Sequence, residues 1–253
     1  MPQLTAFDGH DLIYDVEGGG PPVVLLHGFT SSVEGNWRTP GIWRAVVDAG
    51  CQAIGLDARG HGRSARPHDP ADYADGAIVR DVGTLFDHLQ LESAALVGYS
   101  LGALTALRFA AVDGRVNKLV VGGIGGDPQS WRSPEQQVAN AARAQRWIAG
   151  LEAEDESTLD DPVSLRVRRL ARERGNDLLA LAATQRTSRL LGDDPVLERI
   201  TMPTLVICGD QDFDPHPLAR ALPDGEALVL DGDHESVVRN PQLAKAIAAF
   251  VSD

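Results

Sequence analysis

Five residues, Gly-Tyr-Ser-Leu-Gly at positions 98–102, decide the fold. They directly follow the apolar run Ala94–Val97 and lead into an apolar helical pattern over Leu101–Ala111. A serine on such a tight turn between strand and helix adopts strained backbone angles, and the flanking glycines leave room for it. The turn raises the hydroxyl above the sheet, at the positive end of a helix dipole. The pattern therefore predicts a nucleophilic Ser100.

Short apolar runs alternate with helical patterns on both sides of this turn. An N-terminal pair, Gln3–Phe7 and Asp11–Glu17, is typical of a hairpin. The later runs are mostly unbroken, as in strands buried on both faces: Val23–Leu26, Cys51–Leu56, Ala94–Val97, Val116–Val121, Leu205–Cys208 and Ala227–Leu230. Helical patterns lie near Ile42–Ala49, Ala77–Leu89, Ser100–Val112, Pro217–Ala221 and Pro241–Val251. We therefore expect an α/β fold, a mostly parallel, doubly wound sheet of about eight strands.

One segment, 127–200, contains helical patterns but no convincing strand. We expect residues 1–126 and 201–253 to form the core, and 127–200 a helical cap inserted after the sixth strand. Helical spacing groups Val138, Ala142 and Ile148 on one face beside Trp147, which favours this face as the roof of a pocket; the alternative is that it packs on the core. The arginines of the segment are expected to be mostly solvated.

Composition excludes several classes of protein. The chain has 253 residues, with 23 Lys and Arg against 36 Asp and Glu, a formal net charge of −13. Such a charge disfavours general binding to nucleic acid or to an anionic membrane. We find no run of 18 apolar residues and no signal-peptide pattern at the start, so a cytoplasmic protein is expected. Cys51 and Cys208 are predicted to be buried hydrophobes, and metal-ligand spacing is absent.

Two further blocks accompany the serine turn. His-Gly-Phe at 27–29 follows the third predicted strand, and Asp-Ala-Arg-Gly-His-Gly-Arg-Ser at 57–64 follows the fourth. With these blocks the chain resembles the α/β-hydrolase superfamily, in particular its small capped serine hydrolases of the carboxylesterase type, over nearly its whole length. The resemblance implies a catalytic triad in the chain order serine, acid, histidine.

The histidine and the acid follow from this order. His234 comes after the last predicted strand and before the C-terminal helix, where the family has its catalytic base. Three carboxylates follow the strand Leu205–Cys208, and Asp212 lies at the family's usual position for the acid. Asp210 and Asp214 are expected to be a turn residue and a helix cap. Asp127, after the sixth strand, remains an alternative acid.

The remaining site residues are also implied by the resemblance. The oxyanion hole is expected from the backbone N–H groups of Phe29 and Leu101, with His27 bracing the loop that carries Phe29. Trp37, Tyr99 and Trp147 are candidate substrate-binding residues, although packing is the commoner role for such tryptophans.

These residues together predict a serine hydrolase that cleaves small-molecule carboxylic esters through an acyl-enzyme, with no cofactor and no metal. The same machinery also serves lactones, thioesters, carbon–carbon bonds and perhydrolysis, because fold and triad do not fix the substrate. A ligand receptor built on the hydrolase fold is the alternative from another class. A serine rather than an aspartate at the turn disfavours haloalkane dehalogenase and epoxide hydrolase chemistry.

Overall fold

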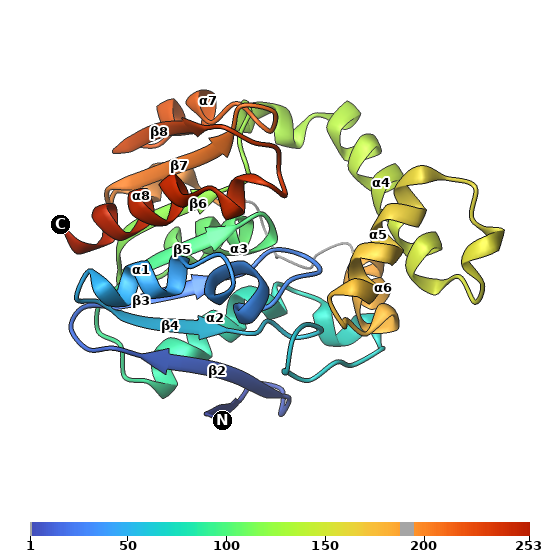
Figure 1. Ribbon diagram of the computed structural model, residues 1–253, viewed down its shortest axis with the longest axis horizontal. Helices are drawn as coiled ribbons and strands as arrows, with labels where there is room; N and C mark the ends of the chain where they lie inside the picture. Colours follow the sequence, from blue (N-terminus) through green and yellow to red (C-terminus); the bar gives the residue numbers. More distant parts are fainter. Residues whose placement is uncertain (1, 188–194) are drawn as a thin grey trace.

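The computed structural model describes residues 2–187 and 195–253, which form one eight-stranded sheet in the order β1-β2-β4-β3-β5-β6-β7-β8 (Figure 1). Strands β1 and β2 run antiparallel to their neighbours, and the six others pair in parallel. The strands are β1 Gln3–Thr5, β2 Asp11–Glu17, β3 Pro22–Leu26, β4 Gln52–Leu56, β5 Ala94–Tyr99, β6 Val116–Gly122, β7 Thr204–Gly209 and β8 Gly225–Leu230. The predicted fold class is confirmed.

Helices cover both faces of this sheet. Helices α1 and α8 pack against each other and share one apolar core with the sheet, and α2, α3 and α7 contribute to the core on the other face. The covering helices are α1 Ile42–Asp48, α2 Ala77–His88, α3 Leu101–Ala110, α7 His216–Ala221 and α8 Pro241–Ser252. Burial on both faces explains why the central strands have unbroken apolar sequences. No helix in the described ranges is long and apolar enough to cross a membrane.

Between β6 and β7 the described residues are helical and contain no strand. They form α4 Pro134–Glu152, α5 Pro162–Glu173 and α6 Leu178–Arg186, with short turns of helix before, between and after them. We call residues 127–187 the helical insert. Its helices stand beside the sheet rather than on either face (Figure 1). They pack around a small apolar cluster of their own: Leu151, Val167, Ala171, Leu181 and Ala182. Residues 188–194 of the predicted cap lie outside the described residues.

The unit β5–turn–α3 depends on close backbone contact. A Cβ built on Gly102 would lie 2.0 Å from the carbonyl oxygen of Leu26 at the end of β3, and one on Gly98 would lie 2.3 Å from the carbonyl oxygen of Gly102. Neither position has space for a methyl group. The first turn of α3 therefore lies directly against the ends of β3 and β5.

Replacement of Gly102 by alanine is expected to lower the free energy of unfolding by about 3 kcal/mol or more, because backbone atoms must move to admit the methyl group. The matched control is Gly114→Ala. Gly114 is exposed, and a Cβ there meets nothing within 4 Å. Urea unfolding of both variants tests this, and equal stabilities would contradict the close contact.

Candidate active site

Ser100 lies at the turn that the sequence predicts. Its backbone has φ 52° and ψ −110°, a left-handed conformation that non-glycine residues seldom adopt. Its N–H donates to the carbonyl of Gly122 on β6, at 2.8 Å, which helps to hold this strained turn. The residue precedes the first residue of α3, so its hydroxyl lies at the positive end of the helix dipole.

Ser100, His234 and Asp212 form a hydrogen-bonded chain. His234 Nε2 lies 3.1 Å from Ser100 Oγ, so it can accept the hydroxyl proton. His234 Nδ1 lies 2.9 and 3.1 Å from the two carboxylate oxygens of Asp212. The Asp212 side chain is 6% exposed and that of His234 is 36% exposed. The acid is therefore shielded, while the imidazole faces the open side where a reacting group would enter.

Two aromatic residues position the imidazole. The hydroxyl of Tyr99 donates to the carbonyl of His234 at 2.6 Å, and its ring centroid lies 5.4 Å from the imidazole. Burial raises the pKa of Tyr99, which keeps the phenol protonated as a donor. The ring of Phe213 approaches the imidazole edge-on at 6.2 Å. Tyr99 thus fixes the backbone of His234 while the two rings flank its side chain.

The other predicted acids lie elsewhere. Asp210 accepts a hydrogen bond from the N–H of Gly232, and Asp214 accepts one from His216 at the start of α7. Asp127 caps the helical turn Pro128–Arg132 by accepting from the N–H of Gln129. None of the three bonds to His234.

The loop after β3 presents a backbone amide beside the serine. Neither Phe29 nor Leu101, the two predicted oxyanion-hole residues, uses its N–H in a hydrogen bond with any described residue. The N–H of the preceding Gly28 is instead held by Asn36 Oδ1 at 3.0 Å. Gly28 also approaches the nucleophile closely, since a Cβ built on it would lie 3.4 Å from Ser100 Cβ. The unpaired N–H groups of Phe29 and Leu101 thus belong to the residues that directly follow Gly28 and Ser100.

Two buried histidines support the same loop. His27 Nδ1 lies 2.8 Å from the carbonyl oxygen of Gly28, and its Nε2 accepts from the N–H of Ala58 at 3.0 Å. Its ring lies 5.3 Å from that of His61. Burial lowers the pKa of both residues, that of His61 to about 3. His27 therefore braces the loop as a neutral ring, in agreement with the sequence.

Residues of the helical insert hold the next residue of this loop. Thr30 has a positive φ of 62°. Its side-chain oxygen accepts from Arg174 at 2.9 Å, and its carbonyl accepts from Asn176 Nδ2 at 2.7 Å. Arg174 also pairs with Glu235, the residue after His234, at 2.5 Å. These contacts could not be predicted from the sequence, because Arg174 is one of many arginines in the insert.

The three aromatic residues predicted to bind substrate have different positions. Tyr99 lines a cavity beside Ser100. Trp147 stacks on Phe29 with ring centroids 5.0 Å apart and nearly parallel planes. The structure corrects the prediction for Trp37: its side chain is 1% exposed and packs in the core with Ile42 and Trp43, so it does not line this cavity.

The face predicted as the roof also needs correction. Val138 is 69% exposed and Ala142 is exposed, whereas Ile148 is buried. A different face of α4, carrying Gln136, Asn140 and Arg143, lines a cavity of about 330 Å³ whose other walls include Leu104 and Phe213. The apolar residues of α4 do not line this cavity, so hydrophobic periodicity indicated the wrong face of the helix.

Metal ligation receives no support from side-chain clusters. In the ranges 2–187 and 195–253, no group of three or more His, Cys, Asp or Glu side chains is arranged to hold a metal ion. The described site offers a serine hydroxyl, an imidazole bonded to a carboxylate, and two unpaired backbone N–H groups.

Comparison with known proteins places the chain in a family. The family model for the alpha/beta hydrolase fold matches residues 21–160. The 3-oxoadipate enol-lactonase 2 of Acinetobacter baylyi is 30% identical over 208 residues, 75% of this chain and 74% of that protein. A hydrolase structure from Pseudomonas aeruginosa has a TM-score of 0.75 at 25% identity, covering 100% of this chain and 98% of that one. The chain therefore belongs to the alpha/beta hydrolase fold family.

Other relatives match a shorter region. The non-heme chloroperoxidase of Kitasatospora aureofaciens is 34% identical over 114 residues, 45% of this chain and 40% of that protein. This chain spans less than half the length of several curated relatives, the chloroperoxidase among them. Family and relatives together support a hydrolytic enzyme.

The depressed pKa of His61 makes folding stability depend on pH. The unfolded chain binds a proton at this histidine below pH 6.5, and the folded chain does not until about pH 3. Stability is therefore lost as the pH falls below 6.5, by about 2 kcal/mol between pH 7.5 and 5 from His61 alone. Urea unfolding of wild type and His61→Asn at both pH values isolates this residue. The pH-dependent loss should be smaller in the variant by about 2 kcal/mol, and equal losses would contradict a neutral buried His61.

Proposed function

We propose that the protein is a serine hydrolase that cleaves carboxylic esters through an acyl-enzyme intermediate. The observation that carries the proposal is the chain of hydrogen bonds from Ser100 through His234 to Asp212. A serine hydroxyl is a poor nucleophile near neutral pH unless a base within hydrogen-bonding distance takes its proton. Here the base is at 3.1 Å and a shielded carboxylate orients it.

In the first half of the proposed reaction, Ser100 Oγ attacks the ester carbonyl carbon while His234 Nε2 takes its proton. Asp212 stabilises the imidazolium that forms. The carbonyl oxygen becomes an oxyanion, and the unpaired N–H groups of Phe29 and Leu101 stabilise its charge. The tetrahedral intermediate collapses, the bond to the alcohol oxygen breaks, and His234 gives the proton to the leaving alcohol.

In the second half, water attacks the acyl-enzyme carbonyl and His234 accepts one of its protons. Collapse of this second intermediate releases the carboxylic acid and returns the proton to Ser100. The residues of the chain supply every proton transfer in this scheme, and no cofactor enters it.

We further propose that the helical insert caps the site. Two observations support this: Trp147 on α4 stacks against Phe29, and Arg174 bonds to Thr30 and Glu235. Substrate would then contact Tyr99 and Trp147, and the polar face of α4 would meet its distal part.

Lactones are cyclic esters and would follow the same steps. A relative that matches 75% of this chain is named 3-oxoadipate enol-lactonase 2, so lactones belong in the substrate panel beside open-chain esters. Attack on either substrate gives the same acyl-enzyme chemistry, because only the tether between acyl and alcohol parts differs.

Ser100→Ala is expected to lower kcat for a 4-nitrophenyl ester by about 10⁴-fold or more, because the nucleophile is lost. The folded state should persist, since among the described residues the hydroxyl bonds only to His234. Circular dichroism and a melting curve provide the control. Activity within tenfold of wild type in a pure sample would contradict the assignment. A wild type that binds ligands but turns over no ester or lactone would favour a receptor.

Asp212→Asn is expected to lower kcat by several orders of magnitude, because an amide favours the wrong imidazole tautomer and cannot stabilise its charge. The matched control is Asp127→Asn, since asparagine also caps helical turns and this residue does not contact His234. Steady-state kinetics of both variants test the acid. A crippled Asp127→Asn beside an active Asp212→Asn would overturn it.

A further inference from the structure

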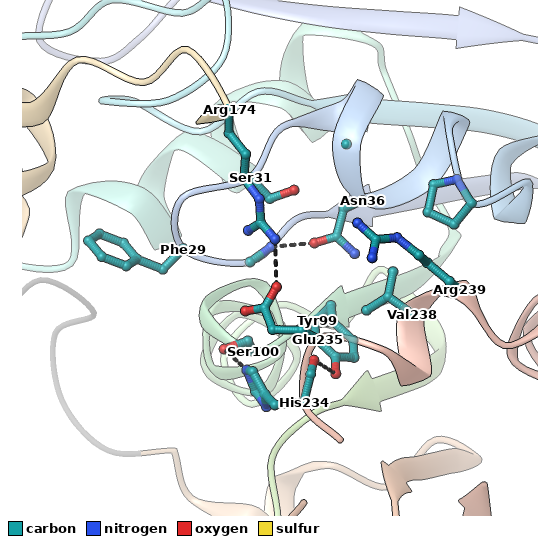
Figure 2. Close-up of a pocket in the computed structure, with 13 residues that line it drawn as sticks. Phe29, Ser31, Asn36, Tyr99, Ser100, Arg174, His234, Glu235, Val238 and Arg239 are labelled. Carbon is teal, nitrogen blue, oxygen red and sulfur yellow. Dashed lines mark hydrogen bonds and ion pairs between the residues drawn. The ribbon is translucent and has the colours of Figure 1, made fainter. Parts of the chain in front are cut away.

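A second feature of the site lies on the side of Ser100 that faces the loop between β3 and α1. A cavity of about 50 Å³ extends from Ser100 and Gly28 to Asn36 on this loop and to Arg239 near the C-terminal helix (Figure 2). It has room for a few water molecules or for one small polar group. Its walls also include Ser100 and His234, but no step of the proposed mechanism uses Asn36 or Arg239.

Asn36 presents an unsatisfied donor on this side. The residue is only 4% exposed, and its Oδ1 accepts from the N–H of Gly28, which fixes the orientation of the amide. Its Nδ2 is buried and has no hydrogen-bond partner among the described residues. A buried amide donor without a partner costs free energy that a ligand acceptor would recover. Asn36 lines the cavity, so an acceptor bound in the cavity would lie beside this amide.

The charges around the cavity favour an anion. Arg174, Arg239 and Glu235 line it. Glu235 is neutralised by its ion pair with Arg174 at 2.5 Å, as the dashed line in Figure 2 marks. The backbone N–H of Arg239 donates to the carbonyl of Ser236, but its guanidinium makes no ion pair or hydrogen bond with the residues that the structure describes. In a chain with a net charge of −13, this cavity beside the nucleophile therefore has an excess of one positive charge.

We propose that this cavity is a subsite for a carboxylate carried by the substrate, on a limb separate from the ester that Ser100 attacks. One carboxylate oxygen accepts from Asn36 Nδ2 and the other from the Arg239 guanidinium. The inference rests on the proposed function and specifies its substrate class as esters of dicarboxylic acids or of other acids with a second, free carboxylate.

A carboxylate fits these donors better than a neutral polar group. An amide donor and a guanidinium together offer N–H groups to two oxygens, and the charged donor gives the stronger type of hydrogen bond. A neutral ester or ketone at the same place would leave the Arg239 charge unpaired. The small volume favours a short limb that ends in the carboxylate.

The test compares two substrates that differ only in this charge, 4-nitrophenyl hydrogen glutarate and 4-nitrophenyl methyl glutarate. The measured quantity is the ratio of kcat/KM for the acid to kcat/KM for the methyl ester. Wild type is expected to prefer the acid by about tenfold or more, the usual worth of a charge-assisted hydrogen bond. Arg239→Gln should lower the ratio by about tenfold or more, because the charge is removed.

Asn36→Asp gives a second variant. Its carboxylate still accepts from the N–H of Gly28, but the donor is replaced by a negative charge, so the ratio should fall at least as far. Arg44→Gln is the control, since Arg44 is an exposed arginine paired with Asp48 outside the cavity, and it should leave the ratio unchanged. An unchanged ratio in Arg239→Gln, or no preference in wild type, overturns the subsite.

A binding measurement separates this proposal from the proposed function. Calorimetric titration of Ser100→Ala with glutarate needs no turnover. Binding that weakens about tenfold or more when Arg239→Gln is added supports the subsite even if no ester is cleaved. Hydrolysis of both esters without preference overturns the subsite and leaves the hydrolase proposal intact. Failure of wild type to cleave either ester contradicts the hydrolase proposal alone.

Discussion

The contact between the first turn of α3 and the end of β3 is the constraint on which the rest of the site depends. Gly102 lies against the carbonyl of Leu26, and Ser100 is held with φ 52° between them and β6. The loop that begins at His27 must therefore pass over the serine turn. This one close approach brings Ser100 beside the loop that carries Gly28 and Phe29. A side chain at position 102 would separate them.

Polar contacts then fix the loop at three points, each by a different part of the chain. His27 holds the carbonyl of Gly28, Asn36 holds its N–H, and Arg174 and Asn176 hold Thr30. Donors that must stabilise charge in a transition state are most effective when they are fixed before the reaction starts. Neutral, buried histidines suit this task. A charged imidazole at the same place would be destabilised by the loss of its hydration.

The sequence predicted the sheet well and singled out Ser100, Asp212 and His234 as candidates for a local reason. Central strands are buried on both faces and read as apolar runs, and Ser100, Asp212 and His234 each follow one of these strands. Family resemblance adds the order in which they occur. The position of Trp37 could not be predicted, because a tryptophan after this loop is compatible with either a core or a pocket. Its packing with Ile42 and Trp43 places it in the core.

The contacts of the helical insert could not be predicted from the sequence. Helix α4 has few apolar residues, so its periodicity did not reveal that Gln136, Asn140 and Arg143 line a cavity. Arg174 and Asn176 reach a loop more than 140 positions earlier in the chain, and no local pattern encodes a contact of that range. The contact of Asn36 could not be predicted from the sequence either. Its side chain accepts from the backbone N–H of Gly28, which comes within reach only in the folded loop.

The attachment of Thr30 to the insert has a consequence for engineering and for evolution. An insert that made no bonds to the core could be exchanged between relatives as an independent module. Here Arg174 and Asn176 lie in the insert, while the residue they hold lies in the core. A chimera that replaces 127–187 without keeping these two side chains would also release the loop beside the nucleophile. Among recombinants at these boundaries, those that keep Arg174 and Asn176 would therefore also keep the loop in place.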